Sequence, residues 1–241
     1  PAPGSLVKTT LDNDNTPTFT WVPPVDGVAS YEMRMDGGDW TDIGNVTSYT
    51  HTTALDDGAH IFQVRTRDVA GNIGPVASLN FSIDVTPPTA PSNVMKTTPD
   101  NVNTPTFTWN AATDATSGIA SYEVKIDDES WTDIGNFNTY TQATAIGDGS
   151  HTFYVRARDS ANNTGTEASL VFNIDATPPT APTNLAKTTP DSDDTPTFTW
   201  DAVPGAASYQ VRIDTGSYSN IGNVLTYTHP TALANGTHTL Y

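Results

Sequence analysis

Three histidines recur in closely similar sequence contexts and could supply metal-ligating or acid–base side chains. His60, His151 and His238 stand in GAH, GSH and GTH. Imidazole is a common metal ligand and general base in proteins. No second His or Cys stands at a ligand spacing from them, and the copies lie about one repeat apart. We therefore interpret each as a histidine at the start of a strand that contacts the backbone.

Two tryptophans could form a platform for a carbohydrate. Trp40 and Trp131 stand in DGGDWTDIGN and DDESWTDIGN, beside acidic and glycine-rich turns, and Tyr218 is their counterpart further along. Aromatic faces are common contact surfaces for ligands. An aromatic residue that recurs once per repeat more often packs over a sheet edge. Packing is our interpretation, and glycan binding stays an alternative.

Nothing in the chain indicates an enzyme. Neither a Ser-His-Asp set, nor a phosphate-binding loop, nor a pair of glycosidase carboxylates can be argued from the spacing of residues. We expect no catalytic residue and no bound organic cofactor.

Composition excludes several other classes of function. The 241 residues carry a net charge of −17 and no cysteine. Such acidity opposes a nucleic-acid partner, and the lack of cysteine excludes disulfides and thiolate metal sites. No apolar stretch approaches the roughly 20 residues that span a bilayer, and Pro1 does not open a signal peptide. We expect a soluble internal segment without a membrane span.

The sequence repeats itself three times. TPTFTW ends at Trp21, Trp109 and Trp200, which are 88 and 91 residues apart. The gap from each Trp to the next SY motif is 10, 13 and 9 residues, ending at Tyr31, Tyr122 and Tyr209. A segment that absorbs insertions between aligned flanks behaves as a surface loop. We predict three modules, at residues 1–85, 86–176 and 177–241.

Within each module, apolar and polar residues alternate as in strands with one wet face. Several short strands separated by turn signals favour a sandwich of about seven antiparallel strands. The fold class is therefore all-β, in tandem sandwiches. The predicted inward-facing core consists of Phe19, Trp21, Tyr31, Phe62 and Val64; Phe107, Trp109, Tyr122, Phe153 and Val155; and Phe198, Trp200 and Tyr209.

Turns and linkers carry their own signals. Gly71 aligns with Asn162, two residue types that tolerate positive φ, which predicts a tight connection between the last two strands. IDVTPPTAP and IDATPPTAP join successive modules, and their paired prolines favour an extended rod. The third module stops at Tyr241, which aligns with Gln63 and Tyr154. We expect that it is truncated, or that another chain completes it.

The segments TPTFTW, SYEVKID, DGSHTFYVRARDSANN and ASLVFNIDATPPTAP together resemble bacterial immunoglobulin-like and fibronectin type III-like repeats. These repeats occur in giant surface adhesins, stalks and cell-wall proteins. The resemblance covers essentially the whole chain. It implies an extracellular, cell-surface location and a tandem, rod-like role, and it carries over no catalytic residue.

The same resemblance implies calcium at the joints between modules, since adhesin-type repeats often stiffen their joints with this ion. Carboxylate and carbonyl oxygens are the ligands that calcium requires. Turns also use Asp for local hydrogen bonds, so solvated turns are the simpler interpretation. The candidate ligands are Asp84 with Asp100, Asp175 with Asp191, and the loop residues Asp68 and Asp159.

Three functions remain open from the sequence. The leading hypothesis is an extracellular structural spacer that contacts neighbouring modules of its own chain. The second is a self-assembling filament or sheath in which a strand from a second copy completes the third module. The third is a glycan-binding module.

Overall fold

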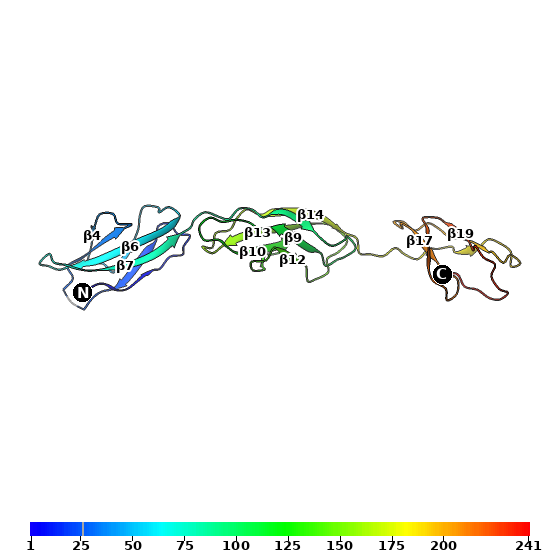
Figure 1. Ribbon diagram of the computed structural model, residues 1–241, viewed down its shortest axis with the longest axis horizontal. Helices are drawn as coiled ribbons and strands as arrows, with labels where there is room; N and C mark the ends of the chain where they lie inside the picture. Colours follow the sequence, from blue (N-terminus) through cyan, green and yellow to red (C-terminus); the bar gives the residue numbers. More distant parts are fainter. Residues whose placement is uncertain (26) are drawn as a thin grey trace. The chain divides into compact units, whose positions relative to one another are not determined.

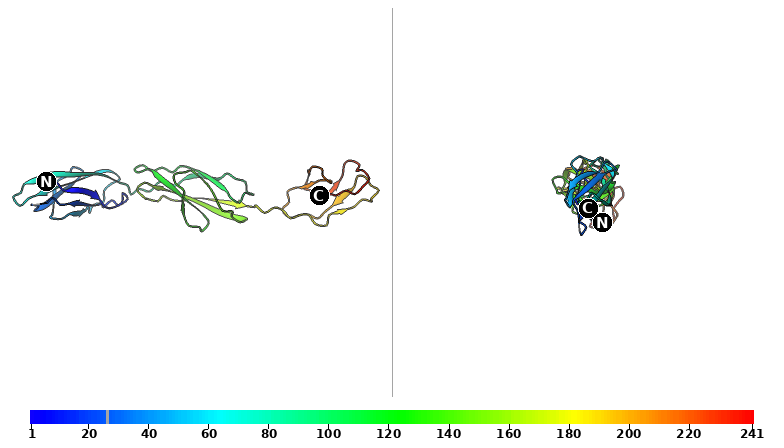
Figure 2. Two further views of the ribbon diagram at one scale, coloured as in Figure 1. Left: turned by 90° about the horizontal axis from the view of Figure 1, so that it is seen from below. Right: turned by 90° about the vertical axis from the view of Figure 1, so that its left-hand side faces the viewer.

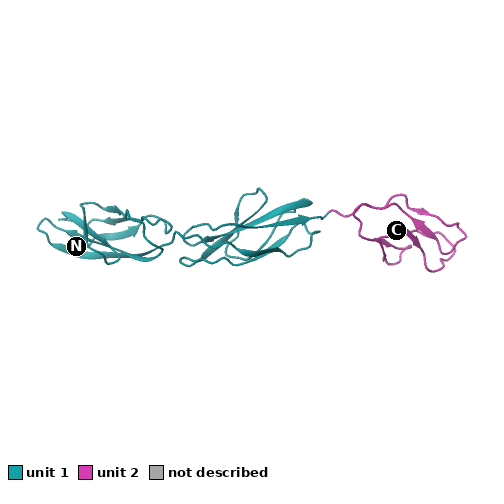
Figure 3. Cartoon of the chain, turned by 90° about the horizontal axis from the view of Figure 1, so that it is seen from above, with its two compact units in different colours: residues 1–176 teal, residues 177–241 magenta. Residues whose placement is uncertain are grey.

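The computed structural model describes residues 1–25 and 27–241. The chain divides into two compact units, residues 1–176 and residues 177–241, which Figure 3 draws in different colours. Every regular element in the described residues is a β-strand. No described helix is long and apolar enough to cross a membrane.

The first module is a sandwich of two antiparallel sheets (Figure 1). Its strands pair in the orders β1-β2-β5 and β4-β3-β6-β7. The strands are β1 (Gly4–Lys8), β2 (Thr18–Val22), β3 (Ser30–Met35), β4 (Thr41–Gly44), β5 (Ser48–Thr50), β6 (Gly58–Arg67) and β7 (Ile73–Ile83).

The second module repeats this topology. Figure 2 shows the strands of the chain from two further sides. Its sheets have the orders β12-β9-β8 and β11-β10-β13-β14. The strands are β8 (Ser92–Lys96), β9 (Thr106–Asn110), β10 (Ile119–Ile126), β11 (Thr132–Asp133), β12 (Thr139–Thr141), β13 (Gly149–Asp159) and β14 (Ala168–Ile174). The prediction of all-β, seven-stranded antiparallel sandwiches is confirmed in both modules.

Residues 177–241, all of which the structure describes, form a three-stranded sheet, β15-β16-β19, and a two-stranded sheet, β17-β18. An isolated bridge joins Ile213 to Leu240. The strands are β15 (Ala186–Lys187), β16 (Thr197–Thr199), β17 (Tyr209–Val211), β18 (Ser219–Gly222) and β19 (Thr226–Thr228).

Each sandwich encloses aromatic rings that face one another across the two sheets. Phe19 on β2 stacks on Phe62 of β6 with ring centroids 4.0 Å apart, and Phe107 stacks on Phe153 at the same distance. Such pairs add about 0.5–1.5 kcal/mol to the burial of their area. Of the thirteen predicted core residues, twelve are buried and Phe198 is half-buried.

The loop after β6 and the equivalent loop after β13 have the backbone conformation that the sequence predicts. Gly71 and Asn162 both adopt positive φ, at 87° and 83°, in the β6–β7 and β13–β14 loops. The tight turn is confirmed in both modules. It places Asp159, the last residue of β13, at the end of the second module that receives the linker from the first.

Candidate functional site: the joint between the first two modules

The linker that follows β7 is hydrogen-bonded to the first module. The N–H of Asp84 donates to the carbonyl of Asp12 at 2.9 Å. The N–H of Val85 donates to a carboxylate oxygen of Asp57 at 2.7 Å, and the hydroxyl of Thr86 donates to the other oxygen. The first residues of the linker therefore belong structurally to the first sandwich.

The same linker is also hydrogen-bonded to the second module. Ser117 donates its N–H to Oδ2 of Asp84 at 3.1 Å, and the Asn163 side-chain amide donates to the Asp84 carbonyl at 2.8 Å. Further along, the N–H of Thr89 donates to the carbonyl of Thr113 at 2.9 Å. Asp84 thus has partners in both sandwiches.

Glycine at position 165 lets the linker lie directly against the second module. A Cβ at this position would lie 2.5 Å from the carbonyl oxygen of Pro88, closer than a Cβ normally approaches an oxygen. The proline-containing segment is therefore packed on the β13–β14 loop, and its position depends on the missing side chain.

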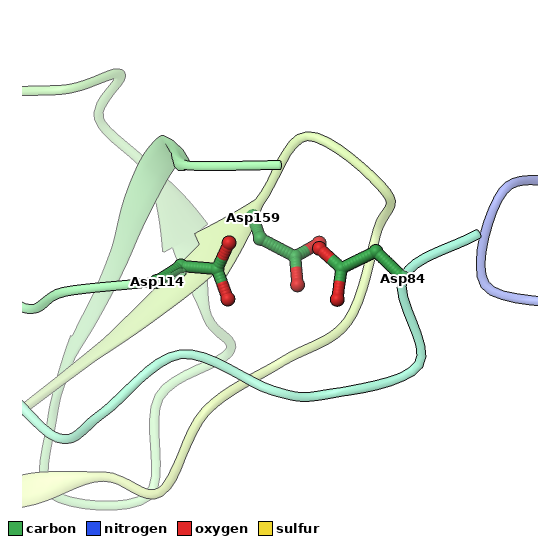
Figure 4. Close-up of side chains that lie close together, drawn as sticks. All are labelled: Asp84, Asp114 and Asp159. Carbon is green, nitrogen blue, oxygen red and sulfur yellow. The ribbon is translucent and has the colours of Figure 1, made fainter. Parts of the chain in front are cut away.

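Three carboxylates converge at this joint: Asp84 from the linker, Asp114 from the β9–β10 loop and Asp159 from the end of β13 (Figure 4). One oxygen from each lies within 4.8 Å of the others. The exposed fractions of Asp84 and Asp159 are 1% and 2%, whereas Asp114 is partly exposed. Groups separated by 30 and 45 residues in sequence thus meet in one site.

Local turns hold the two carboxylates of the second module. Asn163 donates its backbone N–H and its side-chain amide to Asp159, both at 2.8 Å. Oδ1 of Asp114 accepts the N–H groups of Thr116, Ser117 and Gly118 at 2.7–3.1 Å. These bonds fix the carboxylates before any ligand binds.

The neighbours of the three carboxylates are neutral donors. Among the described residues, no Lys, Arg or His forms an ion pair with any of them. Like charges so close together, two of them shielded from water, repel unless a cation or proton compensates them. Hard oxygen donors of this kind match the preference of Ca²⁺, whose opposite ligands stand about 4.6–5.2 Å apart.

The structure brings together only two of the six aspartates that the sequence suggested as calcium ligands, Asp84 and Asp159. Asp100, proposed as the partner of Asp84, accepts a hydrogen bond from Lys96 at 2.6 Å, and its carbonyl accepts the N–H of Asp175. It therefore lies at the other end of the second module. Asp68 binds Asn72 in the β6–β7 loop, Asp191 pairs with Lys187 at 2.8 Å, and the Asp175 side chain is exposed.

Sequence reasoning missed Asp114, although a signal was present. The Trp-to-Tyr gap is longest in the second module, and Asp114 stands in that longer loop. The gaps of the other modules are shorter, although the first module also has an Asp, Asp26, at the same distance from its Trp as Asp114 has from Trp109. The available signal for Asp114 was therefore the longer Trp-to-Tyr loop, at the end of the second module that receives the linker.

The recurring histidines use both ring nitrogens for structural contacts. His60 contacts the Asp36 carboxylate through Nδ1 and the Asp56 carbonyl through Nε2, both at 2.8 Å. His151 and His238 repeat this pattern. The backbone contact matches the sequence interpretation, whereas the carboxylate contact was not foreseen. With both nitrogens engaged, no ring nitrogen is free to activate a nucleophile.

The aromatic residues considered as a carbohydrate platform lie under cationic side chains. The guanidinium carbons of Arg65 and Arg34 lie 3.9 and 4.7 Å from the ring centroid of Trp40. Arg156 and Lys125 approach Trp131 in the same way, and Arg212 approaches Tyr218. These cation–π contacts pack each ring against basic side chains of its own module.

Comparison with known families identifies the first module. Residues 4–85, nearly all of it, match the family model described as the bacterial Ig-like domain. The first module is a bacterial Ig-like domain. The second module, residues 86–176, has the same strand orders and therefore shares the fold of the first.

Curated relatives contain stretches similar to these Ig-like modules. Chitinase A1 of Niallia circulans is 29% identical over 174 residues, which are 65% of this chain and 23% of the relative. Endoglucanase B of Cellulomonas fimi is 30% identical over 171 residues, 64% of this chain and 16% of the relative. The chain thus spans less than a quarter of the length of either protein.

Solved structures that match contain fibronectin type III domains. The FN1–FN3 domains of chicken CNTN1 match with a TM-score of 0.40 and 16% identity, covering 99% of this chain and 91% of that one. A two-domain segment of chicken tenascin matches with a TM-score of 0.34 and 11% identity, covering 72% and 99%.

Proposed function

We propose that this chain is a non-catalytic spacer of an extracellular protein, in which a built joint holds the first two Ig-like modules in a fixed orientation. The observation that carries the proposal is the double attachment of Asp84, whose backbone N–H bonds to the first module while its carboxylate and carbonyl bond to the second. A flexible linker would need no such contacts, whereas a spacer that fixes the position of one module relative to the next needs them.

The similarity to a chitinase and an endoglucanase supports a place beside other domains of a larger protein. In those proteins the matching stretch occupies 23% or less of the length. The two complete sandwiches contain repeated structural contacts in place of a single converging active site. We therefore assign the chain the task of spacing such domains at the cell surface, as in an adhesin or a stalk.

The joint is proposed to bind one calcium ion through Asp84, Asp114 and Asp159. Bound calcium would compensate the charge of the three carboxylates and attach the linker to two loops of the second module. Oδ2 of Asp114 accepts no hydrogen bond from the described residues, so it is available as a ligand. Extracellular modules bind calcium with dissociation constants of about 10⁻⁴–10⁻³ M, which is the range expected here.

Calorimetric titration of the full chain with CaCl₂ tests this assignment. Asp114→Asn removes a ligand charge at the joint and should weaken binding by about tenfold or more. Asp100→Asn is the matched control, because Asp100 binds Lys96 at the other end of the same module and should leave the affinity unchanged. Equal affinity in the two variants, or no binding by the wild type at millimolar calcium, would contradict the calcium site.

A further inference from the structure

Each module contains the same three-part contact, which we call the histidine clamp. It consists of a histidine, the aspartate 24 residues before it, and a backbone carbonyl four residues before the histidine. In the first two modules the histidine lies near the start of β6 or β13, and the aspartate directly follows β3 or β10. The three clamps are His60 with Asp36 and Asp56, His151 with Asp127 and Gly147, and His238 with Asp214 and Ala234. In all three, both ring nitrogens lie 2.7–3.0 Å from oxygen.

This geometry requires a protonated ring. An ionised carboxylate and a backbone carbonyl only accept hydrogen bonds, so Nδ1 and Nε2 must both donate. A neutral imidazole carries one N–H, and its other nitrogen would then direct a lone pair at an acceptor oxygen. Loss of the proton therefore breaks one of the two contacts in each clamp.

The clamps of the first two modules adjoin the groups that anchor the outgoing linkers. His60 binds the carbonyl of Asp56, and the carboxylate of the next residue, Asp57, accepts the N–H of Val85 at 2.7 Å. In the second module, His151 binds the carbonyl of Gly147, and the adjacent Asp148 accepts the N–H of Ala176 at 2.7 Å. One short loop thus connects the histidine to the start of the linker.

The geometry points to a pH-sensitive lock on each linker: the imidazolium of His60 or His151 fixes the loop that anchors the linker, and deprotonation of the ring releases that loop. At mildly acidic pH the linker is held firmly. At alkaline pH the anchor loosens while the sandwich around the aromatic core stays folded.

The groups that face His60 come from four parts of the module. They are Asp36 after β3, Asp56 in the preceding loop, His51 after β5, and the ring of Phe81 on β7. Burial lowers the pKa of His51, so this neighbour loses its proton at a lower pH than His60 does. His151 faces Asp127, the Gly147 backbone and the ring of Phe172.

The expected titration agrees with this arrangement. Partial burial by itself lowers the pKa of His60, but the bonds to Asp36 and Asp56 outweigh it and raise the pKa above the ordinary value of 6.5. The bond to Asp127 raises the pKa of His151 despite partial burial. A raised folded-state pKa means that the stabilisation is complete below pH 6.5 and is lost as the pH rises through the folded value.

Amide hydrogen exchange of the full chain in calcium-free buffer tests the lock separately from the proposed calcium site. Between pH 5.5 and 8.5, after correction for intrinsic exchange, protection of the Val85 and Ala176 amides should fall by about tenfold or more. In His60→Gln, Val85 should be weakly protected at both pH values, while Ala176 keeps its pH dependence as the internal control. Constant protection of Val85 in the wild type, or an unchanged pH dependence of Val85 in the variant, would overturn the inference.

A second measurement covers the case in which His60→Gln does not fold. The imidazole resonances of the wild-type chain report the folded-state pKa of each histidine directly. Those of His60 and His151 should titrate above 6.5. Titration at or below that value would equally overturn the lock.

Discussion

The hydroxyl of Tyr122 accepts the buried backbone N–H of Ala112 at 2.9 Å. The bond ties β10 to the segment after β9, which begins the loop that carries Asp114. In the first module, Pro24 stands at the position aligned with Ala112 and has no N–H to give. The hydroxyl of Tyr31 is accordingly buried without a backbone donor.

This difference predicts effects of different size for the same substitution in the two modules. Tyr122→Phe leaves the Ala112 N–H buried and unpaired, and should lower the free energy of unfolding of the second module by about 1–3 kcal/mol. Tyr31→Phe removes a hydroxyl that has no backbone partner, and should change the first module by less than about 0.5 kcal/mol. Hydrogen exchange of core amides reports each module separately. A larger loss in the first module would contradict the assignment.

Gly165→Ala should disturb the joint between the first two modules. The added Cβ meets the carbonyl of Pro88, a backbone atom that cannot rotate away, so the linker must shift at a cost of about 1–3 kcal/mol. Exchange of the Thr89 amide, which is bonded to Thr113, should accelerate. Gly147→Ala is the control, since nothing lies within 4 Å of a Cβ there. Equal Thr89 exchange in both variants would show that the packing does not matter.

Stability of the second module should be highest at mildly acidic pH. Burial would raise the pKa of Asp127, but the bonds from His151 and Thr152 outweigh it and hold the pKa below the ordinary 3.8. This stabilisation is present above pH 3.8 and is lost as the pH falls through the folded value. Since the His151 contribution is lost on the alkaline side, the maximum should fall between about pH 4 and 6.5. Melting temperatures that rise steadily to pH 9 would contradict this.

The cation–π contact at Trp131 should contribute measurable stability. Arg156 binds the Glu123 carboxylate at 2.7 Å and lies 4.1 Å from the Trp131 ring. Arg156→Gln loses both contacts and should lower the free energy of unfolding by about 1 kcal/mol. Lys125→Gln loses cation–π contacts with Trp131 and Tyr154 but no ion pair, and should have about half that effect. An unchanged free energy of unfolding for Arg156→Gln in urea denaturation would contradict a stabilising role of these contacts.

The sandwich fold could be predicted from the sequence because its cause is local and repeated. Alternation places Phe19 and Trp21 on one face of β2, and the same pattern returns in the next module with Phe107 and Trp109. Positive φ at Gly71 could also be predicted, because few residue types accept it. These features depend on neighbours in the chain and need no knowledge of distant contacts.

The joint could be predicted only in part, because it depends on contacts between distant residues. Asp84 and Asp159 could be predicted as candidate calcium ligands, because they are acidic residues in a linker and in a loop. The spacing of residues in the sequence could not show that Asp100 lies at the opposite end of its module. Asp114 was missed because the sequence does not show that its loop meets the linker at Asp84. The histidine clamp joins residues 24 positions apart across strands, and its carboxylate was invisible until the strand register was known.

Residual dipolar couplings of the full chain in a weakly aligning medium with millimolar calcium test the central claim most directly. If the linker bonds hold the first two modules together, both sandwiches should give the same alignment tensor, in magnitude and in direction. Asp114→Asn or removal of calcium should make the two tensors diverge. Different tensors for the two modules in the calcium-loaded wild type would contradict the account, because the joint would then be a flexible tether.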